Sequence, residues 1–449
     1  MKNYKLNTPG IFRVLKNKIA SDSDHKEMFN KSFYALVLRV FGLSVNFIFV
    51  LLTTKLYGAE GWGIFAICFS ILQLCSLIGC FGINISIIKL IPQGNINTFK
   101  LYLIILKFII PVNIFLTLLL YLIAPTISTL LTENGQSIEE YIKIISFGIL
   151  PLSITIINSG LFRAKKQIIS FTFFDNLGKF FFGIIVIGLV YFIYGENKFT
   201  MITGFVTGLY ILASISILKV IKIIKNDSNK IHSNEDSTSL KSLLSLSSPI
   251  FWANFIGFGS FYVVTIILAF FVSKEDVALF DVANRLAGVL TIILFAVNSI
   301  SGPKFAESAS NKKLLGKIVH QNGQLLFYSS SVLFVILLIS GNFLLSFFGY
   351  VSIDNSYLIF VLILIGQLIN NLSGSVRLLL QMTGYHLFAQ KISIYSFLFI
   401  SFSLVVFVPL TGLIGASVII SINIAVKNII MVVFVYRKLN IRSFYIPLR

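Results

Sequence analysis

The chain has 449 residues, of which 56% are hydrophobic and only 12% are charged. Soluble domains carry about 25% charged residues, so this composition excludes a soluble globular protein and indicates a polytopic membrane protein. The net charge of +19 does not indicate nucleic-acid binding, because the Lys and Arg residues gather in particular loops, which is a signal of membrane topology.

Apolar runs of about 20 residues, each long enough to cross a bilayer as a helix, recur along the chain. In chain order, the twelve predicted spans are 32–56, 62–84, 101–123, 141–162, 169–193, 200–221, 245–272, 277–301, 324–347, 356–382, 391–409 and 413–436. The segment 1–31 lacks the apolar core of a signal peptide. Its "IFRVLKNKI" stretch is basic and weakly amphipathic, which fits either a helix on the inner leaflet or a basic tail.

The loops between these spans alternate in charge. One set of loops, together with 1–31 and the tail 437–449, holds most of the Lys and Arg residues. The other set is short and holds mainly Lys55, Lys143, Lys198 and Lys274 against acids that include Glu133, Glu139, Glu140 and Asp354. Basic loops stay in the cytoplasm, so both termini are predicted to be cytoplasmic.

A polar connection rich in Ser, Asn and Lys divides the chain in the middle. This stretch, 222–244, is predicted to be a flexible cytoplasmic linker between an N-lobe (32–221) and a C-lobe (245–436) of about six helices each. The sequence therefore predicts an all-α membrane protein with two lobes and no large domain outside the membrane.

A weak internal repeat supports this division. When the chain is shifted by 215 residues, "LYGAEGWGIFAI" (56–67) lies over "FVSKEDVALFDV" (271–282), with Glu60 on Glu275 and Phe65 on Phe280. In both places an apolar helix ends, a short corner carries an acid, and a new helix starts. A repeat of two halves is typical of transporters. Gly58, Gly61 and Gly63 are expected to allow a tight turn and close helix packing.

The chain resembles a known family at several of these stretches. They are the first-helix arginine in "LRVFGL", the "LYGAEGWGIF" corner, "ILPLSITIINSGLFRA", and "SPIFWANFIGFGSFYVVTIILAFFVSKEDVALFDVANRL". These resemble polysaccharide transporters, the O-antigen and capsule repeat-unit flippases of the multidrug/oligosaccharidyl-lipid/polysaccharide exporter superfamily, over nearly the full chain. The resemblance implies a MATE-like fold of two pseudo-symmetric six-helix lobes, alternating access, and the bacterial inner membrane. The implied cargo is an undecaprenyl-diphosphate-linked oligosaccharide.

Charged residues inside the predicted spans point to an anionic cargo. Such groups are costly in hydrocarbon and normally face a bundle interior or a wet cavity. The basic ones outnumber the acidic ones and form the candidate substrate site; they are Arg39, Lys107, Lys179, Arg285, Arg377 and Lys427. The acidic ones, Asp175 and Asp281, are candidates for coupling to an ion. A lipid diphosphate is a suitable counterpart, because guanidinium groups bind its oxygens in pairs.

Each charge also has a simpler explanation. Lys107 and Arg377 lie near helix ends and would reach the membrane surface by snorkelling. The pairs Asp175–Lys179 and Asp281–Arg285 have the four-residue spacing of ion pairs within one helix. Arg39 has no acid within one helical turn and matches the first-helix arginine of the family, which makes it the preferred candidate.

Helix breakers near the start of the seventh span suggest a gate. The stretch "SSPIFWANFIGFGS" combines Pro249 with small residues and two glycines, and the gate is placed at Pro249 and at positions 256 and 258. Proline and small residues allow a membrane helix to bend. Proline is also common in membrane helices without such a role.

The candidate functions belong to different classes. A flippase for lipid-linked oligosaccharide predicts a cationic cavity and no nucleotide motif, so transport would run on an ion gradient or the membrane potential. The alternatives are a multidrug or metabolite exporter, or a lipid II-type flippase, of the same superfamily. A membrane enzyme is disfavoured, since no catalytic motif, metal-ligand spacing or cofactor motif is found. The expected partners are the lipid-linked cargo, membrane lipids and the polysaccharide polymerase machinery, around a monomer.

Overall fold

The computed structural model describes residues 23–91, 97–131, 138–195, 199–228, 240–350, 355–445 and 447; among these, the side chains of 23–36, 39, 194 and 226–228 are not described. The "IFRVLKNKI" stretch lies outside the described residues, as do 229–239 of the predicted linker. Lys198, Glu133 and Asp354 of the predicted outer loops also lie outside them.

The described chain folds into helices. The first half contains α2 (Ser23–Cys80), α3 (Ile83–Leu90), α4 (Thr98–Leu131), α5 (Glu139–Ser146), α6 (Ile149–Ala164), α7 (Ile168–Thr172), the π-helix η2 (Phe173–Leu177), α8 (Gly178–Tyr194) and α9 (Thr200–Ser228). The second half contains α10 (Leu240–Ala269), α11 (Lys274–Gly288), α12 (Leu290–Glu307), α13 (Lys312–Phe347), α14 (Ser356–Leu372), α15 (Val376–Met382) and α16 (His386–Leu439).

These helices provide the predicted membrane crossings. Within the described residues, eight helices are long and apolar enough to span a bilayer, and ten when each of two bent pairs counts as one span. The bent pairs, α5–α6 and α11–α12, turn by 41° and 42°. The two longest helices, α2 and α16, each contain one residue with non-helical backbone angles, Gly58 and Gly412. Division at these two glycines yields the twelve spans expected from the sequence.

Both of these corners depend on glycine. Gly58 has φ 73° and Gly412 has φ 58°, in the left-handed region that residues with a Cβ rarely adopt. At each corner the chain reverses from one span to the next. The glycine-rich stretch at 58–63 therefore has the turning role that the sequence suggested.

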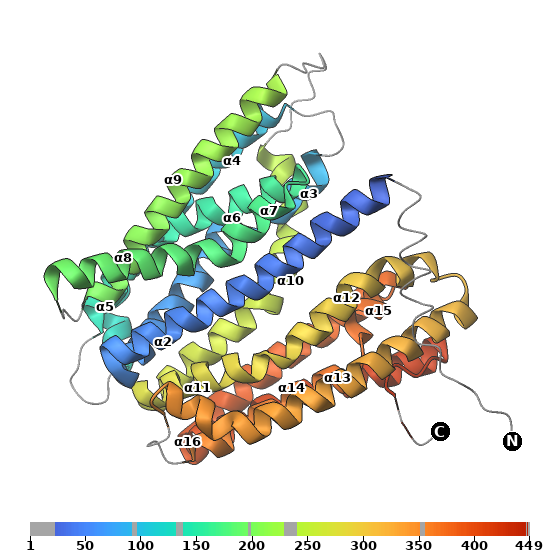
Figure 1. Ribbon diagram of the computed structural model, residues 1–449. Coiled ribbons are helices and arrows are strands. Elements are labelled where there is room, and N and C mark those ends of the chain that lie inside the picture. Colours follow the sequence, from blue (N-terminus) through green and yellow to red (C-terminus); the bar gives the residue numbers. More distant parts are fainter. Residues whose placement is uncertain are drawn as a thin grey trace, which may run out of the picture.

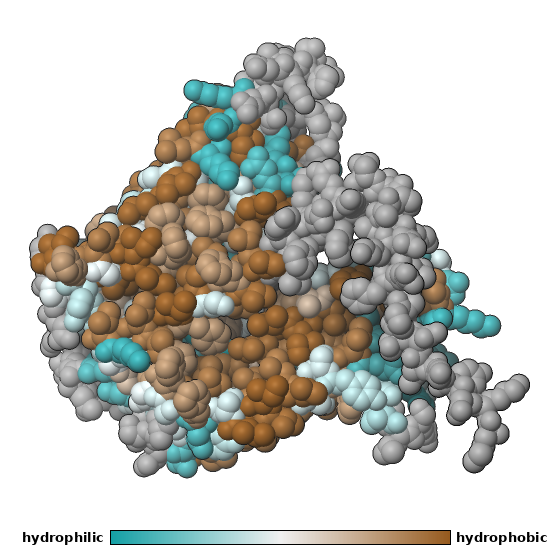
Figure 2. All heavy atoms as spheres, in the orientation of Figure 1, coloured by the Kyte–Doolittle hydropathy of each residue, from teal (hydrophilic) through white to brown (hydrophobic). Residues whose placement is uncertain are grey.

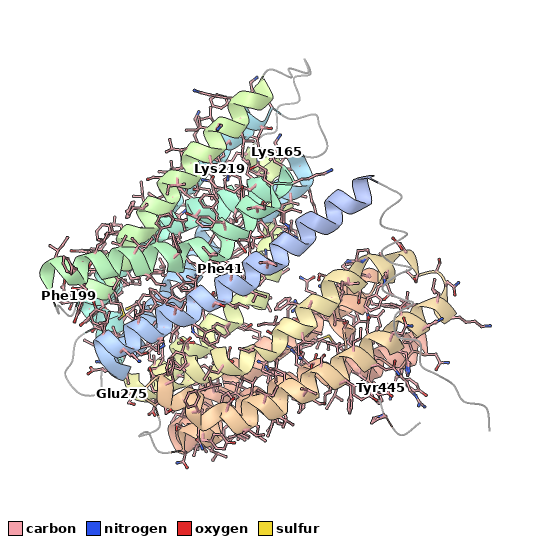
Figure 3. All side chains as sticks on the ribbon, viewed as in Figure 1. Phe41, Lys165, Phe199, Lys219, Glu275 and Tyr445 are labelled. Carbon is pink, nitrogen blue, oxygen red and sulfur yellow. The ribbon has the colours of Figure 1, made fainter. Side chains whose placement is uncertain are left out.

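The spans form two six-helix lobes that approach each other at one end and diverge toward the other (Figure 1). The N-lobe runs from α2 to α9 and the C-lobe from α10 to α16. The long helix α10 lies between them and packs against α2 and α3 of the N-lobe and α16 of the C-lobe. The lobes meet near α11, where Glu275 lies, whereas Lys165, Lys219 and Tyr445 lie toward the diverging end (Figure 3).

The two corners of the internal repeat contact each other where the lobes meet. Lys274 at the start of α11 forms an ion pair with Glu60, at 3.7 Å between Nζ and Oε1. Gly63 lies directly under the backbone carbonyl of Lys274, so that a Cβ at this position would overlap the carbonyl oxygen. Phe65 and Phe280, which the repeat aligns, are both buried. The repeat thus places two equivalent corners against each other.

The outer surface of the lobes is apolar, as a membrane protein requires. Figure 2 shows a mainly hydrophobic face with hydrophilic residues toward its margins. Large apolar side chains that would be unfavourable in water are exposed on the helices, among them Phe192, Ile339, Phe402 and Leu410. The chain is therefore a multi-pass membrane protein.

The close contact at Gly63 predicts a specific sensitivity. Gly63→Ala should lower the melting temperature of the purified protein in detergent, because the added methyl group must displace the Lys274 backbone, and overpacking costs about 1–3 kcal/mol. Gly188→Ala on α8 is the matched control, since nothing lies within 4 Å of its Cβ position. Equal melting temperatures for the two variants would contradict the close packing of the corners.

Candidate functional site

Arg285 and Asp281 form a buried ion pair where the lobes meet. Arg285 Nε donates to Asp281 Oδ2 at 2.6 Å, and the two side chains are 14% and 5% exposed. Both residues lie on α11 with four-residue spacing, so the intrahelical pair expected from the sequence is confirmed. It also joins the two lobes, which the sequence did not indicate. Trp62 Nε1 of α2 donates to Asp281 Oδ2 at 3.1 Å, and Arg285 Nη1 donates to Asn46 Oδ1 of α2 at 2.8 Å.

An aromatic core holds the N-lobe side of this pair in place. The Trp62 ring stacks on Phe65 at 5.2 Å and meets Phe49 edge to face at 6.0 Å, measured between ring centroids. The Arg285 guanidinium lies 5.4 Å from the centre of the Trp62 ring, within the range of a cation–π interaction. Because Trp62 is fully buried, its indole N–H needs an acceptor, and the Asp281 carboxylate provides it.

Lys179 and Asp175 extend this cluster into the N-lobe. Lys179 Nζ lies 5.4 Å from the ring centre of Phe180 and 5.9 Å from that of Phe69, and its charge interacts with those of Asp175 and Arg285. Asp175 lies on the π-helix η2 and accepts a hydrogen bond from Ser159 Oγ at 3.4 Å. We call Arg285, Asp281, Lys179 and Asp175 the central cluster. Its two cations and two carboxylates balance each other.

Arg377 and Lys427 form a second basic site, which we call the C-lobe pair. Arg377 lies on α15 and Lys427 on α16, and these two helices pack against each other. Lys427 is half-buried and Arg377 is exposed. Neither residue forms an ion pair with a carboxylate in the described part of the chain. Unlike the central cluster, this site has two positive charges without an acidic partner there.

The C-lobe pair lies near an amide hydrogen bond and beside a glycine of α10. Asn428, next to Lys427, donates from Nδ2 to Asn370 Oδ1 at 3.0 Å. Gly257 of α10 faces Arg377, because a Cβ at Gly257 would lie 3.8 Å from Arg377 Nη2. A glycine of the candidate gate stretch therefore lies beside a cation of the site.

The two gate glycines lie one residue later than predicted. Positions 256 and 258 hold Ile256 and Phe258, and the glycines of this stretch are Gly257 and Gly259, so the prediction of glycine at 256 and 258 is wrong. The shift matters because α10 is helical here, with 3.6 residues per turn, and the next residue points to a different face. Ile256 is half-buried and Phe258 is exposed, and both carry bulky side chains that lack the freedom of glycine.

The structure contains no break at this gate. α10 runs on through Pro249, and Gly259 is buried against Leu74. Any bending of α10 would depend on Pro249, Gly257 and Gly259, and whether these residues act as a gate stays a prediction.

The other candidates from the sequence lie apart from the two charged sites. Arg39 lies on α2, but its side chain is outside those described, so the preferred candidate stays a prediction. Lys107 is exposed on α4. Neither residue is therefore placed at a site by the contacts of the described side chains.

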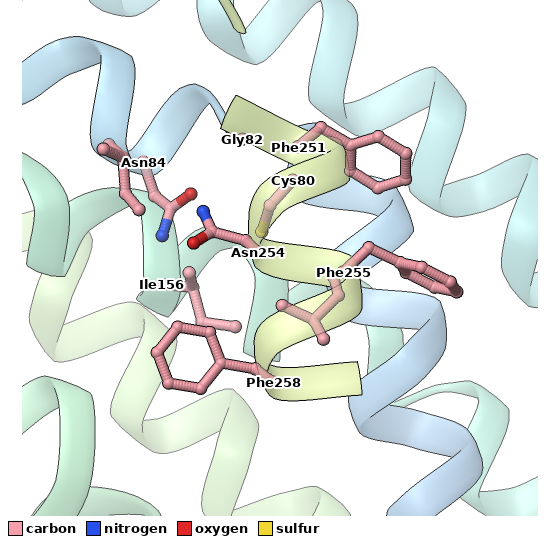
Figure 4. Close-up of a pocket in the computed structure, with 10 residues that line it drawn as sticks. Cys80, Gly82, Asn84, Ile156, Phe251, Asn254, Phe255 and Phe258 are labelled. Atoms are coloured by element: carbon pink, nitrogen blue, oxygen red, sulfur yellow. The ribbon is translucent and has the colours of Figure 1, made fainter. Parts of the chain in front are cut away.

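A small pocket between the lobes contains residues that the sequence reasoning missed. Its volume is about 50 Å³, and it lies between α2, α3, α6 and α10 (Figure 4). The side-chain amides of Asn84 and Asn254 point toward each other across it, above Ile156 and the Phe258 ring. A signal was present, since Asn254 is an amide within the apolar run "PIFWANFIGFG". Its partner Asn84 comes from a distant segment, so only the fold brings the two together.

Solved structures with the same fold are membrane transporters. An inward-facing MATE-family multidrug resistance transporter of the MOP superfamily matches with a TM-score of 0.70 and 12% identity, over 90% of this chain and 98% of that chain. The lipid II flippase MurJ, inward closed, matches with a TM-score of 0.71 and 15% identity, over 91% and 87%. An outward-facing MATE-family transporter of the MOP superfamily matches with a TM-score of 0.60 and 13% identity, over 91% and 95%. The expected MATE-like fold is therefore confirmed.

A family model describes the first part of the chain. The model for the polysaccharide biosynthesis protein family matches residues 28–308, which is more than half of the sequence. The chain therefore belongs to the polysaccharide biosynthesis protein family. No curated protein sequence matches it.

The buried pair predicts an unusual mutational pattern. Arg285→Met should lower the melting temperature strongly, since removing one partner of a buried ion pair costs about 3–5 kcal/mol. Asp281→Asn in the Arg285→Met background should recover much of this loss, because the amide oxygen still accepts from Trp62 and no charge is left buried. Melting in detergent would show this; a double variant less stable than Arg285→Met would contradict the account.

Proposed function

We propose that the protein is a flippase for an undecaprenyl-diphosphate-linked oligosaccharide, an O-antigen or capsule repeat unit, and moves it from the cytoplasmic to the periplasmic leaflet. The observation that carries this proposal is the C-lobe pair. Arg377 and Lys427 hold two positive charges without a carboxylate partner among the described residues. A charge inside a membrane protein needs a counterpart, and a diphosphate group supplies one.

The chemistry of the pair fits a diphosphate. The planar guanidinium of Arg377 forms two parallel hydrogen bonds to one phosphate group, and the ammonium of Lys427 acts as a point charge for the other. Carboxylates in this position would instead favour a cationic drug. Membership of the polysaccharide biosynthesis family supports a saccharide on the diphosphate.

The central cluster has a different role in the proposed cycle. It is neutral as a whole and holds α2 against α11, so it closes the path on the side where the lobes meet. Alternating access requires this contact to open. The ion pair between Arg285 and Asp281 remains intact when the lobes separate, because both residues lie on α11. Protonation or cation binding at Asp281 or Asp175 would weaken the contact and couple opening to an ion gradient or to the membrane potential.

Topology and conformation follow from the charge distribution. Lys165 and Lys219 lie toward the end where the lobes diverge, and basic residues favour the cytoplasmic side (Figure 3). This charge distribution supports the proposal that both termini are cytoplasmic and that the protein is open toward the cytoplasm; the proposed location is the bacterial inner membrane. The TM-score to the inward-facing MATE-family structure is 0.70 against 0.60 for the outward-facing one, which supports this conformation. The protein acts as a monomer and hands its cargo to the polysaccharide polymerase machinery.

The alternative within the same fold is a multidrug or metabolite exporter, or a flippase for lipid II. The structural neighbours include both kinds of transporter, which is the observation that favours this alternative. An exporter would bind its cargo without a phosphate group. The experiment below separates the two classes.

Cells that lack their own repeat-unit flippase provide the test. The wild-type protein should restore long-chain surface polysaccharide, whereas Arg377→Gln and Lys427→Gln at equal membrane expression should each reduce it about tenfold or more, because a hydrogen bond to a charged group contributes about 1.5–3 kcal/mol. Lys222→Gln, on an exposed lysine of α9, is the matched control. Arg39→Gln in the same assay tests the candidate preferred from the sequence.

Two results would contradict the proposal. Full activity of the Arg377→Gln and Lys427→Gln double variant would remove the C-lobe pair from the site. Failure of the wild type with several different repeat units would favour the exporter instead.

A further inference from the structure

We propose that the pocket between Asn84 and Asn254 is a sugar subsite that takes the acetamido group of an N-acetylated sugar. The inference rests on the proposed function, since it names the part of the cargo that this pocket recognises. The pocket lies between α2, α3 and α6 of the N-lobe and α10, and its other wall residues include Leu77, Ile156 and Phe258 (Figure 4).

The two amides are available for a ligand. Within the described part of the chain, neither Asn84 nor Asn254 makes a side-chain hydrogen bond, and both residues are half-buried. An amide in a largely apolar surrounding is costly without a partner. Each asparagine offers both a donor and an acceptor. The two face each other across the pocket, so together they complement a group that also donates and accepts.

The frame around these amides is fixed by close backbone packing. Gly160 of α6 lies against the backbone of Asn84, and Gly82 lies against α10 at Ser247 and Phe251; a Cβ at either glycine would overlap the neighbouring backbone. Ser86 and Ser247 share a hydrogen bond of 2.7 Å between their hydroxyl oxygens. α3 is thereby joined to α10, and the backbones that carry the two amides are fixed relative to each other before a ligand arrives, which lowers the entropy cost of binding.

The size and the walls of the pocket select the group. By the same measure of volume, one water needs about 10–15 Å³, so about 50 Å³ accommodates a group of a few non-hydrogen atoms rather than a whole sugar ring. An acetamido group has four such atoms. Its N–H and carbonyl match the two amides, and its methyl group matches Ile156 and Leu77. The ring itself would lie outside the pocket on Phe258, which is 65% exposed.

The position of the pocket relative to the C-lobe pair fits one continuous ligand. Asn254 and Phe258 lie on α10 within one helical turn of Gly257, which faces Arg377. One turn rises by about 5.4 Å. A diphosphate bound at Arg377 would therefore place the first sugar attached to it next to this pocket.

Three probes test the subsite in lipid nanodiscs that contain the full chain. They are a polyprenyl diphosphate without sugar, the same lipid with one hexose, and the same lipid with one N-acetylhexosamine. Binding is followed by tryptophan fluorescence, since Trp252 lies on α10 and is 57% exposed. The wild type should bind the N-acetylated probe about tenfold tighter than the hexose probe, the change expected when one polar contact of about 1.4 kcal/mol is lost.

Asn254→Leu and Asn84→Leu should remove this preference and leave binding of the hexose probe unchanged. Phe258→Ala should weaken both sugar-bearing probes relative to the bare lipid. Asn342→Leu, on an exposed amide of α13, is the matched control and should keep the tenfold preference. Melting temperatures would show that the variants are folded.

The outcomes separate the two proposals. The sugar subsite is overturned if the wild type binds both sugar probes equally, or if the preference survives Asn254→Leu. In either case, tight binding of the bare lipid leaves the flippase proposal intact. If no diphosphate lipid binds to the wild type, the proposed function fails, and this inference fails with it.

Discussion

The cost of placing charge in an apolar interior governs this structure. An isolated charge within a membrane protein needs a partner or water, and the chain meets this requirement in two different ways. In the central cluster, Arg285 and Asp281 satisfy each other and add Trp62 and Asn46 from the other lobe. In the C-lobe pair, Arg377 and Lys427 have no carboxylate partner among the described residues. The charges of the central cluster are balanced within the protein, whereas the C-lobe pair leaves two cations available for an anionic ligand.

This difference assigns separate tasks to the two sites. The central cluster lies where the α2 corner and the α11 corner pack together, so it belongs to the contact that must break when the lobes move. The C-lobe pair lies beside α10, the helix that packs against both lobes. A ligand bound at the C-lobe pair is therefore next to α10, and α10 can transmit a movement of one lobe to the other. In the proposed cycle, the cargo binds at the C-lobe pair and the central cluster closes the path. The two sites have no residue in common, and α10 links them.

Much of the fold could be predicted from the sequence, because hydrophobic length and loop charge are local signals. The twelve spans and the tight corner at Gly58 follow from such signals. The bends between α5 and α6 and between α11 and α12, and the π-turn at Asp175, could not be predicted, since they depend on packing between helices. The pairing of Asp281 with Arg285 was accessible from four-residue spacing, whereas the hydrogen bond to Trp62, 219 positions away in the chain, required the fold.

The candidate site shows the same division. The sequence already pairs Asp281 with Arg285 and Asp175 with Lys179 by their four-residue spacing, but it does not show that the two pairs lie close together or that Arg377 and Lys427 form a separate basic site. Asn84 and Asn254 do not stand out in the sequence, because a single asparagine in an apolar run has no distinctive pattern. Their significance arises from facing each other across a pocket, which is a property of tertiary structure alone.

The most direct test of the central claim is a binding titration of polyprenyl diphosphate and of the matching polyprenol to the purified protein in nanodiscs, at low and high salt. The account predicts that the diphosphate lipid binds much more tightly than the alcohol and that salt weakens its binding. Arg377→Gln with Lys427→Gln should remove the difference, whereas Lys222→Gln should not. Equal affinity for the two lipids, or a diphosphate preference that persists in the double variant, would contradict it.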